Sequence, residues 1–207
     1  MNNDKVHELL YEAFETEKGG VQVYETALRC TIDEDLREEW EKYLEETKNH
    51  VQIVNSLLDR FGLDPEKQTP GRAVVRHIGT ALVEAMEKAL ANAEPEDAQR
   101  VAAECVVHAE TKDHANWELI GLLSEKVKGE EGKALREAYE EVEEQEDEHL
   151  YHTKGWMREL TLKGLGLPAV TPPPEEKKDV KTAIGAERAK NARNEMVSKG
   201  KKRQAAS

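Results

Sequence analysis

Residues 142–160 read VEEQEDEHLYHTKGWMREL and place acids and imidazoles within an apolar helical pattern. Val142 and Leu160 mark one face of this helix, and Glu146 and His149 fall on the same face. Side chains three residues apart on a helix are neighbours, so this carboxylate and this imidazole can bind one metal ion. A lone Glu-x-x-His is weak evidence in a Glu-rich chain, so a metal site requires matching residues elsewhere.

Three other segments also place acids or histidines within apolar helical stripes. A buried carboxylate without a partner is costly, because desolvation penalises its charge. We therefore expect these inward polar residues to be paired with one another or with a cation. They are Glu17 in the stripe of residues 10–28, His50 in the stripe of residues 40–61, and Glu110 and His114 in the stripe of residues 103–120.

Helix breakers divide the chain into five expected helices and a tail. The prolines at 172–174 cannot continue a helix, so we expect a bundle domain over residues 1–167 and a separate basic tail over residues 168–207. The tail is expected to be disordered or a loosely attached helix near 181–198, and its removal should leave fold and metal content intact. The expected helices cover about residues 5–30, 34–61, 72–92, 96–127 and 133–163.

The order of these polar residues along four long helices resembles the ferritin-like di-metal carboxylate superfamily. In that superfamily two helices each give a Glu and the other two each give Glu-x-x-His. The resemblance covers about residues 5–165, and the spacing of Glu17 and Tyr24 is similar to the first helix of bacterioferritins and rubrerythrins. It implies an all-α four-helix bundle, in which residues 72–92 form an additional crossover helix. The ligands it implies are Glu17, His50, Glu110, Glu146 and His149.

One position departs from the family pattern. Thr47 stands where the resemblance places a bridging glutamate, and His114 is a candidate replacement ligand. Three histidines and three glutamates suit iron or manganese, and the choice between one ion and two stays open. Tyr24 is the candidate catalytic residue. His152 and Glu148 are candidates for orienting a ligating imidazole.

Composition limits the classes of function. Strong helix formers and only 5% aromatic residues favour an all-helical protein, and no apolar run approaches the roughly 18 residues of a membrane span. No secretory signal is evident, so a cytoplasmic location is expected. Residues 1–167 hold 20 basic and 38 acidic residues, a net charge of −18 that disfavours nucleic acid at this body. Two cysteines are too few for a rubredoxin-type centre, which excludes rubrerythrin-like electron transfer within one chain.

The expected function is that of a non-haem iron or manganese redox protein acting on dioxygen or hydrogen peroxide. Such an oxidoreductase could be a peroxidase, a catalase or an oxidase. One alternative is ferritin-like iron oxidation and storage, and another is a metal-free helical interaction protein with internally paired polar residues. We expect a homo-oligomer that binds metal ions. The sequence leaves open the metal, the substrate, the oligomeric state and the role of the tail.

Overall fold

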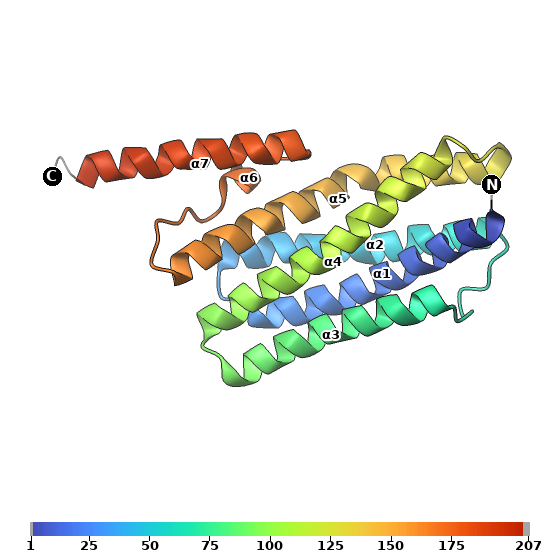
Figure 1. The fold of residues 1–207 in the computed structure, drawn as a ribbon, viewed down its shortest axis with the longest axis horizontal. Coiled ribbons are helices and arrows are strands. Elements are labelled where there is room, and N and C mark those ends of the chain that lie inside the picture. The colour runs from blue at the N-terminus through green and yellow to red at the C-terminus, as the bar shows by residue number, and fades with distance from the viewer. Residues whose placement is uncertain (1, 205–207) are drawn as a thin grey trace.

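The computed structural model describes residues 2–204, and side chains as far as residue 198. These residues form helices and no β-strand, which confirms the all-helical expectation (Figure 1). No helix in this range is long and apolar enough to cross a membrane. The helices are α1 (Asn3–Cys30), α2 (Glu34–Arg60), α3 (Pro70–Asn92), α4 (Pro95–Ser124), α5 (Gly129–Gly164), α6 (Pro174–Lys177) and α7 (Ala183–Gln204).

Helix boundaries follow local capping chemistry. The side chains of Asn2, Asp33 and Thr69 each accept a hydrogen bond from a backbone N–H in the first turn of α1, α2 and α3. Proline occupies the first position of α3 and α4, where its missing N–H has no helical partner. Gly62 follows α2 with φ of +63°, a conformation that glycine adopts without strain. The five expected helices therefore occur within four residues of their expected bounds.

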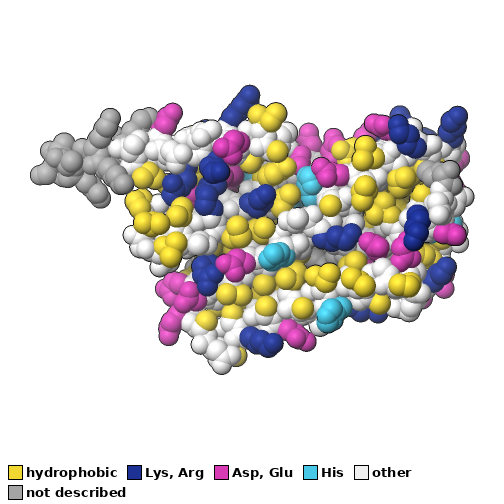
Figure 2. Space-filling model, viewed as in Figure 1, with side chains coloured by type: hydrophobic (Ala, Val, Ile, Leu, Met, Phe, Trp, Pro, Cys, Tyr) yellow, Lys and Arg dark blue, Asp and Glu magenta, His cyan; other side chains and the backbone are white. Residues whose placement is uncertain are grey.

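Four long helices, α1, α2, α4 and α5, lie side by side, and α3 packs on the outside against α1 and α4 (Figure 1). The chain returns along the full length of α3, so α2 and α4 run in the same direction. This is the connection expected of residues 72–92. The outer face of α3 exposes apolar side chains, including Val74 and Ile78. Figure 2 shows a band of hydrophobic side chains along this side of the molecule.

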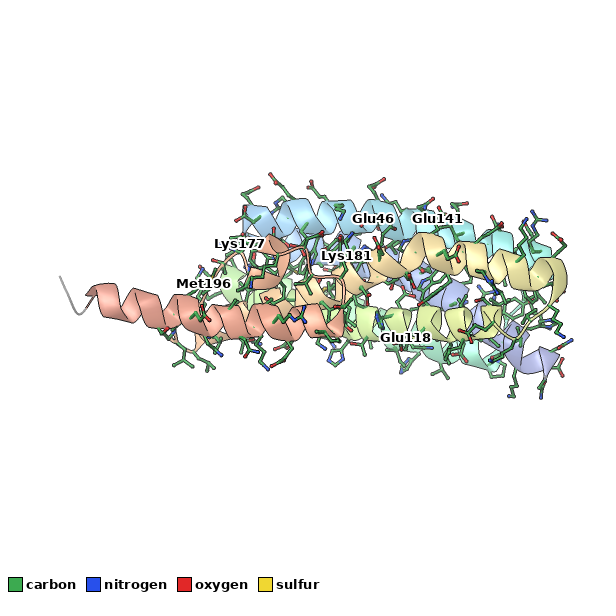
Figure 3. All side chains as sticks on the ribbon, turned by 90° about the horizontal axis from the view of Figure 1, so that it is seen from above. Glu46, Glu118, Glu141, Lys177, Lys181 and Met196 are labelled. Atoms are coloured by element: carbon green, nitrogen blue, oxygen red, sulfur yellow. The ribbon has the colours of Figure 1, made fainter. Side chains whose placement is uncertain are left out.

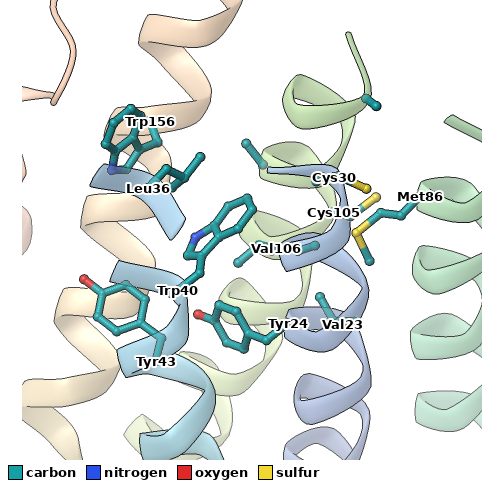
Figure 4. Close-up of a cluster of buried hydrophobic side chains, with 14 of the residues drawn as sticks. Val23, Tyr24, Cys30, Leu36, Trp40, Tyr43, Met86, Cys105, Val106 and Trp156 are labelled. Carbon is teal, nitrogen blue, oxygen red and sulfur yellow. The ribbon is translucent and has the colours of Figure 1, made fainter. Parts of the chain in front are cut away.

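Two apolar clusters fill the interior, and the polar residues singled out above lie between them. One cluster surrounds Trp40 and includes Tyr24, Val106 and Trp156 (Figure 4). The other contains residues from the opposite halves of the same four helices. Each long helix thus passes from one cluster through a polar middle turn to the other cluster. The middle turns are residues 15–17, 47–50, 110–113 and 146–149.

Arg72 connects α3 and its preceding loop to α1 through hydrogen bonds and an ion pair. It is 1% exposed, and it donates to Glu15 Oε2 at 2.9 Å and to two carbonyls of the loop, Pro65 O at 2.6 Å and Lys67 O at 2.8 Å. Arg76 also donates to Glu15, at 2.6 Å, from a more exposed position. A buried carboxylate thus has two cationic partners, which is the arrangement that makes its burial tolerable.

The segment after residue 167 contacts the bundle through charged side chains. Glu175, 2% exposed, accepts a hydrogen bond from Arg158 of α5 at 2.9 Å. Arg193 of α7 donates to the fully buried Glu159 at 2.6 Å. The sequence suggested disorder or a loosely attached helix near 181–198; the structure contains a longer helix held by specific ion pairs. Figure 3 shows α7 extending beyond the end of the bundle.

Candidate metal centre

Five of the six predicted ligands meet in the polar middle of the bundle. Glu17 comes from α1, His50 from α2, Glu110 from α4, and Glu146 and His149 from α5, and none is more than 3% exposed. Each lies on the inner stripe of its helix, where the apolar residues on either side direct it towards the bundle axis. The helical stripes therefore brought these side chains together as the sequence predicted.

The five residues form two groups of three that share Glu146. Glu17, His50 and Glu146 make one group, and Glu110, Glu146 and His149 make the other; within each group the donor atoms lie within 4.8 Å of one another. His50 Nδ1 is 3.1 Å from Glu146 Oε1, and His149 Nδ1 is 3.8 Å from the same oxygen. The two imidazole centroids are 5.7 Å apart. One carboxylate thus stands between two otherwise separate donor sets.

Each ligand presents a buried atom that makes no hydrogen bond to any described residue. These atoms are Oε2 of Glu17, Glu110 and Glu146, and Nδ1 of His50 and His149. A buried polar atom without a partner costs about 1–3 kcal/mol, and more when it is charged. Five such atoms on converging side chains are difficult to explain by packing, whereas oxygen and imidazole donors in this ratio fit a divalent iron or manganese ion.

The outer nitrogens of both imidazoles are held by partners from a neighbouring helix. His50 Nε2 lies 2.7 Å from Gln145 Oε1, and His149 Nε2 lies 3.0 Å from Glu46 Oε2. Since both partner oxygens accept, each Nε2 carries the proton and each Nδ1 keeps its lone pair for the centre. Burial lowers the pKa of His149 to about 4, which favours the neutral form that a metal requires.

Glu46 lies one residue before Thr47 and Gln145 one residue before Glu146, so both fall just off the inner stripes of α2 and α5. Both side chains are long enough to reach an imidazole from the edge of their helix. A position just off the inner stripe therefore does not exclude contact with the centre. The available signal was their place beside the proposed ligands, with Glu46 four residues before His50 and Gln145 four residues before His149.

Asp113 is a further buried acid that sequence reasoning missed. It is 4% exposed, and its Oδ1 makes no hydrogen bond to a described residue. Burial, followed by the charge of Glu146, raises its pKa well above the usual value. It stands three residues after Glu110, the same spacing that joins Glu146 and His149, and this spacing was the overlooked signal.

Four buried carboxylates therefore share the middle of the bundle. Burial is the largest cause of the raised pKa of Glu17 and of Glu110, and each is raised further by neighbouring acids, Asp113 beside Glu17 and Glu146 beside Glu110. Four negative charges in one apolar enclosure repel one another unless protons or cations neutralise them. The charge of two divalent cations would balance that of four ionised carboxylates.

Thr47 and His114 do not contribute to these groups. Thr47 Oγ1 donates to the carbonyl of Tyr43 at 2.8 Å, one turn back in α2. His114 follows Asp113 by one residue, a rotation of about 100° around the helix, and this places it off the inner face. Its Nε2 lies 2.8 Å from Asp147 Oδ1, and this hydrogen bond is the main cause of its raised pKa. The structure thus places the predicted replacement ligand outside both groups, and Asp113 supplies the extra buried carboxylate.

Tyr24 and Trp117 border the centre. Trp117 Nε1 donates to Glu17 Oε1 at 2.7 Å, which leaves the second oxygen of that carboxylate directed to the centre. Tyr24 is fully buried, its ring lies 6.2 Å from that of His149, and its hydroxyl makes no hydrogen bond to a described residue. Burial and then the charge of Glu110 raise the pKa of Tyr24 well above 10, so the phenol keeps its proton.

A second polar chain leads from the centre towards the other end of α5. The ring of Tyr43 lies 4.2 Å from that of His149, and the Tyr43 hydroxyl is 3.0 Å from His152 Nδ1. Glu39 lies 3.6 Å from the same nitrogen and accepts from Trp156 Nε1 at 2.8 Å. His152, proposed from sequence as an orienting partner, therefore reaches His149 only through Tyr43. The other such candidate, Glu148, pairs with Lys42 at 2.8 Å.

No protein-family model matches this chain, and no curated protein or solved structure gives a match. The function of the centre therefore has to be inferred from its own residues.

Proposed function

We propose that the protein is a ferritin-like carboxylate protein that holds two iron or manganese ions and reacts with dioxygen or hydrogen peroxide. The observation that supports this most is the pair of three-donor groups sharing Glu146. Such an arrangement lets one carboxylate bridge two cations, each held by its own Glu and His. Bound ions of this kind supply the redox electrons and the site for the oxidant.

Each residue has a distinct role in this proposal. Glu17 and His50 hold one ion, and Glu110 and His149 hold the other. Glu146 would serve as a ligand in both groups, and the ions would supply the redox chemistry. The mixture of carboxylate oxygen and imidazole nitrogen suits iron and manganese, and the described residues offer no thiolate at this position that would favour other metals.

Asp113 supplies the negative charge of a fourth buried carboxylate, which the family pattern places at the position of Thr47. With Glu17, Glu110 and Glu146 it brings four negative charges, which two divalent ions neutralise. Because Asp113 comes from α4 rather than α2, the buried acids around the two donor groups are distributed asymmetrically. We infer that the ion near Glu17 is the one that Asp113 stabilises, since these two carboxylates repel each other in the metal-free protein.

Tyr24 is proposed as a proton and hydrogen-bond donor next to Glu110. Its hydroxyl is buried, and burial together with the neighbouring Glu110 raises its pKa well above 10, so it keeps its proton. A phenol at that place can donate to a ligand oxygen or to reduced oxidant in a site from which water is largely excluded.

Metal analysis tests the proposal directly. Protein purified without chelator should contain about two iron or manganese ions per chain, and changing both His50 and His149 to Ala should abolish retention while helix content survives. The matched control is His77→Ala, because His77 is an exposed histidine on α3, outside the bundle interior. Equal metal in the wild type and the double variant would refute the proposal.

Two other results of the same experiment would identify the alternatives. A wild type that binds neither iron nor manganese on titration would favour a metal-free interaction protein. Iron far in excess of two ions per chain, in an assembly of shell size by gel filtration, would favour storage.

A further inference from the structure

A pocket of about 180 Å³ lies between α4, α5 and the start of α7, and Glu146 of the candidate centre is among the residues that line it. Glu146 and Trp117 line its inner part, and the exposed Glu118 lines its outer part. Glu146 is 1% exposed, and its Oε2 makes no hydrogen bond to a described residue. The residue that both donor groups share therefore forms part of the pocket wall.

The rim of the pocket is acidic. Glu118, Glu143 and Asp147 all line it, and the only basic candidate on its wall, His114, is paired with Asp147. A concave site lined by one sign of charge concentrates counter-ions and speeds their arrival. The ligands that this pocket favours are small cations, and an anionic substrate would be repelled.

The C-terminal segment completes the wall. Thr182 and Ala183, at the start of α7, line the pocket opposite the residues of α4 and α5. Lys181 anchors this point, with Nζ 3.2 Å from Glu144 Oε2 and 3.5 Å from Glu148 Oε1. Figure 3 shows Lys181 and Glu118 on either side of the start of α7.

We propose that this pocket is the route by which divalent metal cations reach the centre, and that residues 182 and 183 set its width. The proposal rests on the proposed metal centre and adds a function for the C-terminal segment. Cations would first associate with the carboxylates of the rim and then pass to Glu146. The tail would thus control the rate of loading without contributing a ligand.

Loading kinetics test the route in the full-length protein. Co²⁺ is a suitable probe, because its visible absorption changes on ligation and it reports binding without turnover. Ala183→Phe should slow Co²⁺ loading of the metal-free protein by about tenfold, equivalent to about 1.4 kcal/mol of added barrier, with the final stoichiometry unchanged. Ile184→Phe is the matched control, because Ile184 is the next residue, is 67% exposed and does not line the pocket.

The acidic rim is tested by a second variant that leaves the width unchanged. Glu118→Gln combined with Glu143→Gln should slow loading at low ionic strength and flatten its dependence on salt. Wild-type loading rates in both the Ala183→Phe and the double-Gln variants, with normal stoichiometry, would overturn the route and leave the centre standing. A wild type that binds no Co²⁺, Fe²⁺ or Mn²⁺ at equilibrium would instead overturn the metal centre, and the route with it.

Discussion

Glu146→Gln should change the stability of the protein in opposite directions with and without metal. Glutamine has nearly the same shape as glutamate but carries no charge, so it removes the shared ligand with little effect on packing. In the metal-free protein, ionisation of Glu146 leaves an uncompensated buried charge, so the folded state disfavours it. In the proposed metal-loaded protein the same carboxylate would be the ligand that the two donor groups share.

The size of the effect follows from the pKa of Glu146. Burial, then the charges of Asp147 and Glu46, raises it from 4.5 to about 8. Below pH 4.5 the carboxyl is protonated in both the folded and the unfolded chain, so it imposes no penalty. As the pH rises towards 8, Glu146 ionises first in the unfolded chain. The free energy of unfolding therefore falls by less than about 1 kcal/mol at pH 5 and by about 4 kcal/mol at pH 8.

Urea unfolding at pH 5 and pH 8, with chelator or with excess Mn²⁺, measures both effects. With chelator at pH 8, Glu146→Gln should be more stable than the wild type by up to about 4 kcal/mol, and the difference should nearly vanish at pH 5. With Mn²⁺ at 100 times Kd, the wild type should gain about 2.7 kcal/mol per ion, a gain that the variant loses. Glu144→Gln, a more exposed change on the same helix, is the control. A variant that is less stable than the wild type in chelator at pH 8, and equally responsive to Mn²⁺, would refute the reasoning.

Three further changes separate structural from functional residues. His114→Ala should leave the metal stoichiometry measured by titration unchanged, because its imidazole pairs with Asp147, which lies outside both donor groups. A loss of one ion per chain would show that His114 is a ligand. Arg72→Ala should lower the free energy of unfolding by about 3–5 kcal/mol, because it leaves the buried Glu15 with only the more exposed Arg76 as a partner. Arg76→Ala should lower it by about 1 kcal/mol or less. Equal losses for the two variants in chemical denaturation would contradict this. Gly155→Val should displace the chain around residues 173–175, because a Cβ added at this glycine lies 2.9–3.1 Å from that segment. Proteolysis within residues 168–182 should therefore become faster. Gly164→Ala should leave the rate of proteolysis unchanged, because nothing lies within 4 Å of a Cβ added there.

The helices and most of the centre were predictable from sequence because both depend on helical periodicity. An apolar stripe recurring every 3.6 residues fixes which face of a helix is buried, and a Glu or His on that stripe has to enter the interior. Glu17, His50 and Glu110 were found in this way, each from its own helix. Breakers and caps placed the helix ends for a similar reason, since proline, glycine and capping side chains act on the nearest turn.

The C-terminal segment was harder to predict, because its attachment depends on long-range ion pairs. Arg193 reaches Glu159, and Glu175 reaches Arg158, across sequence separations that leave no periodic signal. A basic and apolar-poor composition is typical of disorder, yet buried acids on α5 provide partners for these residues. The helix near 181–198 that the sequence allowed is present as α7, but composition could not identify the residues that attach it to α5.

The sequence by itself determined that four helices bring acids and histidines to a common interior layer. Only the tertiary structure decided which atoms meet there: Glu146 stands between the two donor groups, Asp113 joins the buried carboxylates, and His114 turns outwards to Asp147. The physical reason is that periodicity fixes the direction of a side chain around its own helix axis to within about one residue, or 100°. Contact between donor atoms depends in addition on how the helices are rotated and shifted against one another, and packing between distant segments sets that.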